Sequence, residues 1–321
     1  MNITNRTASS IGEYVEIIED FISPRKKENK EMYFYFRGEK DYGKPALVPS
    51  IYRNGLLEKE HIFYHERMRF NHNDFEKDKT TLDRLCRMQH FGLYTRMLDL
   101  GEDCFTALYF AVEKRKEPNE TTFVYLFAIP EKKVRYYDSD TATILANLAK
   151  LPLNNEGRKI YGDKSKKWLV QNAENIINSG MSVEEYNKEL NFLLHEIRAD
   201  KPYMNPYINL GDLFSVQCVK TKLNNDRILA QKGAFLLFGL NAHDVEKPIP
   251  LDGSYKKPNY WRDDFDWDGM PIEEILKIRI GSEISLGNLA NLGISKPYIY
   301  PNMEKIAEHL VKKFGKQSGE S

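Results

Sequence analysis

The run Thr-Thr-Phe-Val-Tyr-Leu-Phe-Ala-Ile at residues 121–129 constrains the fold more than any other feature of the chain. It is rich in β-branched and aromatic side chains, and Pro130 follows it directly. This composition in a short run predicts a β-strand. Weaker strand or extended signals occur at residues 32–36, 93–98, 214–219, 234–238 and 275–280. Because these segments come from both halves of the chain, we expect both halves to build the core.

Helical signals separate the predicted strands, so the expected fold class is α+β. Residues 9–22 carry apolar side chains at helical spacing, with Ser9 or Ser10 as the N-cap and Pro24 as the stop. Residues 139–200 are mostly helix-forming and are interpreted as a helical insertion. Further helices are predicted at 58–75, 80–91, 104–114, 282–292 and 302–314. The whole chain, 1–321, is interpreted as one domain, with core segments at about 31–138 and 205–314 and a disordered tail at 315–321.

Charge and composition limit the partners that the chain can attract. The 47 basic and 47 acidic residues cancel, so the overall field offers no general attraction for nucleic acid or anionic lipid. No apolar run approaches the length that spans a bilayer, and the N-terminus has no secretory signal, which predicts a soluble cytoplasmic protein without a membrane partner. Three separated cysteines, Cys86, Cys104 and Cys218, are expected to be reduced core thiols.

Polar residues able to do chemistry gather in residues 88–111 and in the short Tyr-Phe-Arg-Gly at 35–38. The longer stretch holds Gln89, His90, Thr95, Arg96 and Asp99. It runs directly into an apolar helical pattern, which predicts the wall of a pocket next to the core. No metal site is expected, because His61 and His65 lack an intervening glutamate and a third ligand. Serine-hydrolase, P-loop and Rossmann motifs are missing from the sequence.

With these residues in view, the chain resembles the FRG domain family, whose name-giving Phe-Arg-Gly stands here at residues 36–38. Further matching blocks are 47–53, 89–99, 107–111 and 226–235. The likeness spans nearly the whole chain. It departs from the family pattern at Leu100, where an aromatic residue is usual, and at Tyr94, where proline is common.

A second likeness is to ADP-ribosyltransferases of the Arg-Ser-Glu type. Those enzymes present an aromatic-Arg-Gly strand end, then a Ser/Thr strand running into a helix, then a Glu-bearing turn, and residues 35–38, 95–111 and 231–235 follow that order here. The resemblance implies a mixed, mostly antiparallel β core surrounded by helices, with NAD as substrate and no metal. The catalytic Glu-x-Glu is missing, and Gln231 stands at the glutamate position.

The resemblance also implies roles for individual residues. Arg37 would bind the diphosphate of NAD, and Gly38 would allow its close approach. Cleavage of the nicotinamide bond develops positive charge on the ribose, which Asp99 or Gln231 would face. The candidate catalytic residues are Arg37, His90, Asp99 and Gln231. The candidate cofactor-binding residues are Arg37, Gly38, Arg53, Gln89, Thr95, Arg96 and Arg227.

Structural interpretations compete for several of these residues. Arg37 can be a buried ion-pair partner of Asp99. Arg96 lies three residues before Asp99 and can hold the loop by a salt bridge. Arg53 and Arg227 can be surface or loop anchors. Sequence alone leaves these alternatives open.

Three functions follow from the sequence. The leading hypothesis is an NAD-dependent ADP-ribosyltransferase-like effector that modifies protein or nucleic acid, or an NAD glycohydrolase. In a bacterial cell the resemblance would suit a toxin or phage-defence protein, with an antitoxin as a further partner. The alternative is a non-enzymatic module that binds a nucleotide or a partner segment. The third is a metal-independent nuclease that uses His90 and Arg96.

Overall fold

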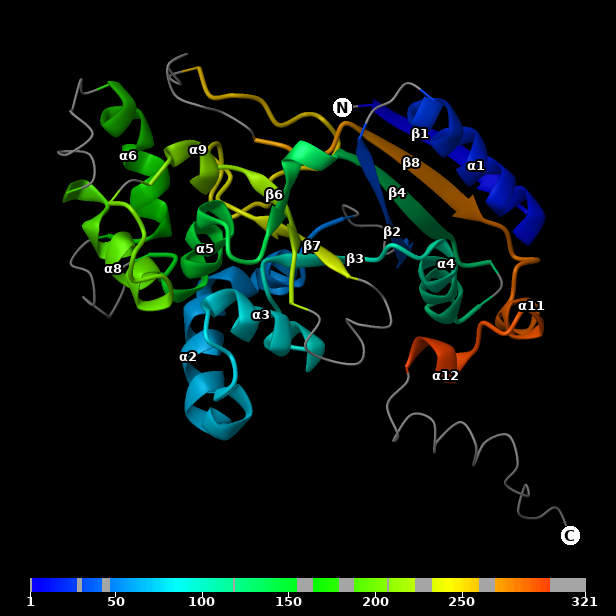
Figure 1. Cartoon of the computed structure of the whole chain (residues 1–321), viewed down its shortest axis with the longest axis horizontal. Coiled ribbons are helices and arrows are strands. Elements are labelled where there is room, and N and C mark those ends of the chain that lie inside the picture. The colour runs from blue at the N-terminus through cyan, green and yellow to red at the C-terminus, as the bar shows by residue number, and fades with distance from the viewer. Residues whose placement is uncertain are drawn as a thin grey trace, which may run out of the picture.

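The computed structural model describes residues 2–27, 31–41, 47–117, 119–154, 164–178, 188–206, 208–222, 233–259 and 269–300. Within these residues the chain is an α+β protein with two four-stranded sheets (Figure 1). The pairs β1–β8 and β5–β6 are parallel, and the other strand pairings are antiparallel. The predicted α+β class with a mixed sheet is therefore confirmed, whereas the likeness to an ADP-ribosyltransferase fold stays a prediction.

Each sheet combines strands from distant parts of the chain. The first sheet has the order β1 (Asn2–Ala8), β8 (Glu274–Ile280), β4 (Thr122–Pro130) and β2 (Met32–Lys40). The second has the order β3 (Met97–Leu100), β7 (Ala234–Phe238), β6 (Val216–Lys220) and β5 (Val134–Tyr136). The segments before and after the predicted insertion thus pair with each other in both sheets.

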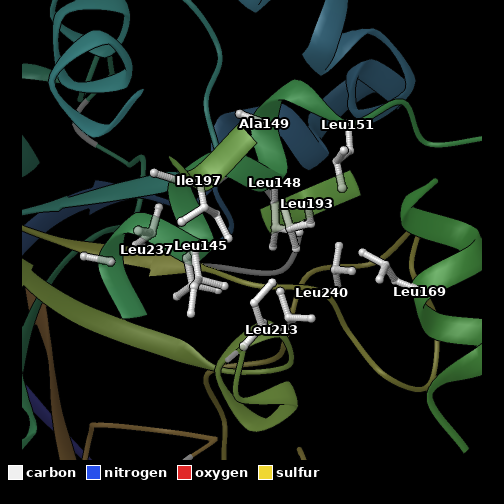
Figure 2. Packing of buried hydrophobic residues seen from close by; sticks show 14 of the residues in the cluster. Leu145, Leu148, Ala149, Leu151, Leu169, Leu193, Ile197, Leu213, Leu237 and Leu240 are labelled. Atoms are coloured by element: carbon white, nitrogen blue, oxygen red, sulfur yellow. The ribbon is translucent and has the colours of Figure 1, made fainter. Parts of the chain in front are cut away.

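The two sheets pack face to face, and helices cover both outer faces. The first sheet is covered by α1 (Ile11–Lys27) and α4 (Cys104–Glu113). The second sheet packs against a larger helical group (Figure 1). Its members are α2 (Glu60–Phe70), α3 (Thr81–His90), α5 (Asp140–Asn147), α6 (Lys166–Asn178), α8 (Asn191–Asp200) and α9 (Leu210–Leu213). Figure 2 shows Leu237 of β7 in one apolar cluster with Leu145 of α5 and Ile197 of α8. The result is a four-layer helix–sheet–sheet–helix arrangement.

This layering explains why the strongest strand signals were continuous apolar runs. Successive side chains of a strand point to opposite faces. In β7, Leu236 packs between the sheets and Leu237 packs against the helical group. In β4, Phe127 lies between the sheets and Leu126 packs under α1 and α4. Because both faces of these strands are buried, neither strand alternates polar and apolar residues.

Several boundaries differ from the sequence predictions for identifiable reasons. Strand β1 was missed, because its residues are polar and mostly exposed along one edge of the sheet. The helix predicted at 58–75 is split into α2 and a short 3₁₀ turn, and a 3₁₀ segment, Ser50–Lys59, precedes it. Helix α1 continues past Pro24. The helix predicted at 302–314 and the tail at 315–321 lie outside the described residues.

The remaining described helices are short. They are α11 (Leu286–Asn291) and α12 (Lys296–Ile299), with 3₁₀ turns at His72–Phe75, Glu131–Lys133 and Leu148–Lys150.

In the part of the chain that the structure describes, no helix combines the length and the apolar character needed to span a bilayer.

Strand β2 and helix α4 approach each other unusually closely at Gly38. A Cβ atom added to Gly38 would lie 1.9 Å from the carbonyl oxygen of Ala107 and 2.6 Å from the amide nitrogen of Ala111. Both neighbours are backbone atoms, so a side chain cannot be accommodated by rotamer changes. Gly38 therefore sets the distance between β2 and α4.

We predict that Gly38→Ala lowers the free energy of unfolding by about 2–3 kcal/mol, because the added methyl group overlaps helix backbone. Urea denaturation followed by circular dichroism measures this change. Gly12→Ala is the matched control, since its added Cβ would meet only the Ser10 hydroxyl oxygen at 3.8 Å. The control should leave stability unchanged or raise it by up to ~1 kcal/mol. Equal stabilities of the two variants would contradict the packing role of Gly38.

Candidate functional site

A polar cavity opens where β2, β3 and α4 meet. Backbone hydrogen bonds between Phe36 and Gly101, at 2.7 and 2.9 Å, join β2 to the residue after β3 and so connect the two sheets. The cavity beside this connection has a volume of about 160 Å³. The described residues lining it are Phe36, Arg37, Gly38, Asp99, Leu100, Gly101, Asp103, Thr106, Ala107, Phe110, Glu113, Lys114 and Tyr300. We call it the smaller cavity.

Arg37 is held on one side of the smaller cavity by its neighbours. Its Nε donates to Glu39 at 3.1 Å, and its Nη1 donates to the backbone oxygen of Asp99 at 3.0 Å. The carboxylate of Asp99 is farther away, at 3.9 Å from Nη1. The Nη2 group of Arg37 has no hydrogen-bond partner among the described residues. Arg37 and Asp99 are thus in contact mainly through the hydrogen bond to the Asp99 backbone. The Nη2 group of Arg37 is left to bind a ligand.

Lys114 is a second cation of the smaller cavity, and the sequence did not single it out. It follows the last residue of α4, and its Nζ donates to the Gly38 carbonyl oxygen at 2.9 Å. Burial, reinforced by repulsion from Arg37, lowers the pKa of Lys114 to about 8. A bound negative charge would relieve that repulsion.

Glu39 balances these cations and was also missed. It is buried and accepts hydrogen bonds from Arg37 and, at 3.1 Å, from Arg53. Burial alone would raise the pKa of Glu39, but Arg37, Lys114 and Arg53 outweigh it and lower the pKa. The signal was present in the sequence, because residues two apart in a strand share a face, which places Glu39 beside Arg37.

Asp99 supplies an accessible carboxylate. Half of its side-chain surface is exposed, and its Oδ1 accepts from the Gln89 amide at 3.0 Å. Gln89 in turn accepts a hydrogen bond from the hydroxyl of Thr95, which is buried. Gln89 and Thr95 do not line the smaller cavity themselves and reach it through Asp99. The predicted block at 89–99 therefore acts on the smaller cavity as a chain of hydrogen bonds.

Two further carboxylates line the smaller cavity. Asp103 caps α4 by accepting from the amides of Phe105 and Thr106 at 2.9 and 3.2 Å. Glu113 accepts from the Tyr300 hydroxyl at 3.0 Å. With Asp99, three carboxylates thus line the smaller cavity together with the cations Arg37 and Lys114. Such a mixed lining suits a ligand that carries both signs of charge.

The other predicted site residues are distributed differently. Arg53 lines a separate, larger cavity on the far side of Glu39. His90 ends α3, where its ring packs edge-on against Phe91, and it lines neither cavity. Arg227 and Gln231 lie outside the described residues.

Arg96 lies in a buried ionic cluster and lines neither of these two cavities. Its side chain is 0% exposed and donates to Glu60 of α2 and, at 3.0 Å, to the Phe238 carbonyl oxygen. Lys166 of α6, also 0% exposed, donates to the same Glu60 carboxylate at 2.6 Å. The salt bridge of Arg96 is therefore with Glu60 and not with Asp99, the partner that the sequence suggested. The reason is that the tertiary fold buries Arg96 against α2. This contact set gives Arg96 a structural role and leaves it no access to a ligand.

The fold and the smaller cavity together define an α+β protein with a charged cavity at a strand end. Residues 32–120 match the family model described as FRG domain, and this segment supplies every described residue of the smaller cavity except Tyr300. The chain therefore carries an FRG domain at residues 32–120. Searches of curated proteins and of solved structures found no significant match. The described residues contain no group of three or more His, Cys, Asp or Glu side chains placed to hold a metal ion.

We predict that Glu60→Gln lowers the free energy of unfolding by about 3–5 kcal/mol, because it leaves Arg96 and Lys166 buried without their counterion. Chemical denaturation measures the loss. Glu66→Gln is the matched control in the same helix, since Glu66 pairs with Arg69 at the surface. That exposed pair should contribute less than about 1 kcal/mol to the free energy of unfolding, so Glu66→Gln should lose no more than this.

The loss of stability in Glu60→Gln should also depend on pH. Burial opposes ionisation of Glu60, but Arg96 and Lys166 outweigh it and lower its pKa from 4.5 to about 2. The stabilisation by the Glu60 carboxylate is therefore present above about pH 4.5 and is lost as the pH falls toward about 2. The stability gap between wild type and Glu60→Gln should narrow over that window. A gap independent of pH would contradict the ionic role of Glu60.

Proposed function

We propose that the chain binds NAD at the smaller cavity and cleaves its nicotinamide bond, either transferring ADP-ribose to a protein or nucleic-acid acceptor or hydrolysing NAD. The observation that carries this proposal is the combination of two cations and three carboxylates in one small cavity. NAD carries a negative diphosphate and a positive nicotinamide ring, so it matches both kinds of charge.

The geometry supports separate roles for the two kinds of charge. Arg37, whose Nη2 group has no partner within the described part of the chain, and Lys114 hold the diphosphate through charge-assisted hydrogen bonds. Asp99, whose side-chain surface is half exposed, faces the ribose and stabilises its developing positive charge. A volume of about 160 Å³ fits the central part of a dinucleotide, with the bases extending beyond the cavity.

The wider role in the proposal rests on the resemblance to ADP-ribosyltransferases. An enzyme that consumes NAD or modifies cellular macromolecules suits a toxin or a phage-defence effector, and its host would require an antitoxin or a trigger. The candidate glutamate substitute, Gln231, cannot ionise, so Asp99 is the carboxylate on which the proposed chemistry depends.

A non-enzymatic nucleotide-binding module is the second candidate. The specific observation in its favour is that Asp99 already accepts a hydrogen bond from Gln89 and lies beside Arg37, which reduces its availability to a substrate. Such a module would bind NAD but release no nicotinamide. A nuclease that uses Arg96 has no support from the geometry, because Arg96 is fully buried.

We predict that Arg37→Lys weakens NAD binding by tenfold or more, because it removes a charge-assisted hydrogen bond worth about 1.5–3 kcal/mol. Isothermal calorimetry measures the affinity. NADH, whose nicotinamide ring is neutral, should bind less tightly than NAD to the wild type. Arg87→Lys is the matched control, because Arg87 pairs with the buried carboxylate of Asp78 outside both cavities.

Transfer is tested by incubating the protein with labelled NAD and a cell lysate, then separating label on protein from label on nucleic acid. Arg37→Lys and Asp99→Asn should lose transfer or nicotinamide release, while Arg87→Lys retains it. NAD binding without either product would favour the binding module. No NAD binding by the folded wild type would exclude both functions.

We also predict that NAD affinity falls as the pH rises through about 8, where the Lys114 ammonium loses its proton. If only the charged form binds the diphosphate, affinity should drop by up to about tenfold between pH 7 and pH 9. Lys114→Arg, which stays charged over this range, should bind NAD with little pH dependence. The same pH dependence in both proteins would show that another group titrates.

A further inference from the structure

A second, larger cavity of about 1290 Å³ lies on the inner face of the first sheet, next to the segment at residues 247–252. Most of its described lining is aliphatic or aromatic. These apolar residues are Ile3, Leu47, Val48, Tyr52, Phe123, Tyr125, Pro248, Ile249, Pro250, Leu251 and Ile275. The polar ones are Asn5, Glu39, Lys40, Asp41, Arg53, Asn241, Lys247, Asp252 and Lys277. Large, mainly apolar cavities with a few polar groups are typical of sites for small organic molecules.

Lys277 presents a cation to this larger cavity. Strand register places Lys277 directly opposite Tyr125 on one side and Asn5 on the other, so all three share one face. Its Nζ lies 3.9 Å from the centre of the Phe123 ring and 5.8 Å from that of Tyr125. Cation–π contacts orient the ammonium group but do not neutralise its charge.

The Lys277 ammonium has no hydrogen-bond or ion-pair partner among the described residues. The other two lysines of the cavity differ, because Lys40 pairs with Glu120 and Lys247 with Asp244. A half-buried ammonium without a counterion is unfavourable, since burial removes part of its hydration. Lys277 is therefore the cation best placed to receive an anion.

Arg53 offers a second set of open donors at the same cavity. Its Nη2 donates to Glu39 at 3.1 Å and to the Val48 carbonyl oxygen at 2.9 Å. These bonds fix the guanidinium, while its Nε and Nη1 groups have no partner among the described residues. Glu39 does not compete for an incoming ligand, because Arg37 and Arg53 already neutralise it.

We propose that the larger cavity binds an organic anion, with its anionic group held by Lys277 and Arg53 and its apolar body packed against Ile249, Leu251 and Ile275. The charges favour an anion, since both cations have N–H groups without a partner among the described residues. Size and lining require an organic body, because an inorganic ion would leave most of an apolar volume of this size empty. This site is separate from the smaller cavity and does not depend on NAD binding there.

The test uses 1-anilinonaphthalene-8-sulfonate, an aromatic sulfonate whose fluorescence rises in apolar sites, on the full chain. We expect saturable binding by the wild type that is about tenfold weaker in Lys277→Met, because the charge is lost while the aliphatic stem is kept. Lys220→Met is the matched control. Lys220 also sits over a tyrosine ring, 3.6 Å from the centre of Tyr33, but lies outside the larger cavity. The control should bind the probe as the wild type does.

Two further comparisons locate the probe and identify the ligand class. Lys114→Met, which alters only the smaller cavity, should keep full probe binding even if it abolishes NAD binding. Displacement by AMP would identify a nucleotide, and displacement by decanoate would identify an acyl carboxylate. The proposal is overturned if Lys277→Met binds as tightly as the wild type, if Lys220→Met or Lys114→Met loses binding equally, or if neither competitor displaces the probe.

Discussion

The close contact between β2 and α4 at Gly38 is the constraint on which the candidate site depends. With no side chain between them, the strand and the helix approach until a Cβ would overlap the Ala107 carbonyl oxygen. This approach lets Lys114, just beyond the end of α4, reach the Gly38 carbonyl oxygen at 2.9 Å. It also sets Arg37, the residue before Gly38, on the opposite face of the strand, beside Glu39 and Asp99. The absence of a side chain at Gly38 thus allows both the close packing of β2 against α4 and the charged cavity beside them.

Buried ion pairs connect the helical group to the second sheet. Glu60 of α2 receives hydrogen bonds from Arg96, just before β3, and from Lys166 of α6. These residues lie far apart in the sequence, so their ion pairs connect α2 and α6 of the helical group to the second sheet. The apolar cluster that contains Leu148 and Leu193 also joins this group to the sheet (Figure 2). Buried ion pairs add little net stability compared with apolar residues, but they penalise any arrangement that separates the partners.

The sequence predicted the secondary structure of the core more reliably than the roles of its charged residues. The strands at β4 and β7 were found because burial on both faces produces a continuous apolar run. Strand β1 was missed because an exposed edge strand needs no apolar pattern, and only its pairing with β8 defines it. The partner of Arg96 was missed for a related reason, since Glu60 is distant in the sequence and no local pattern connects them.

The sequence alone indicated the α+β class and the FRG resemblance, and it singled out Arg37, Gly38 and Asp99 as candidate site residues, because strand signals and short motifs are local properties of the chain. Only the tertiary structure decided which charges meet. It placed Lys114 and Glu39 next to Arg37, it placed Arg96 in a buried cluster, and it gave Lys277 no ion-pair partner among the described residues. These outcomes depend on how distant strands and helices pack, and electrostatic energies depend on distances and burial that a linear sequence does not contain.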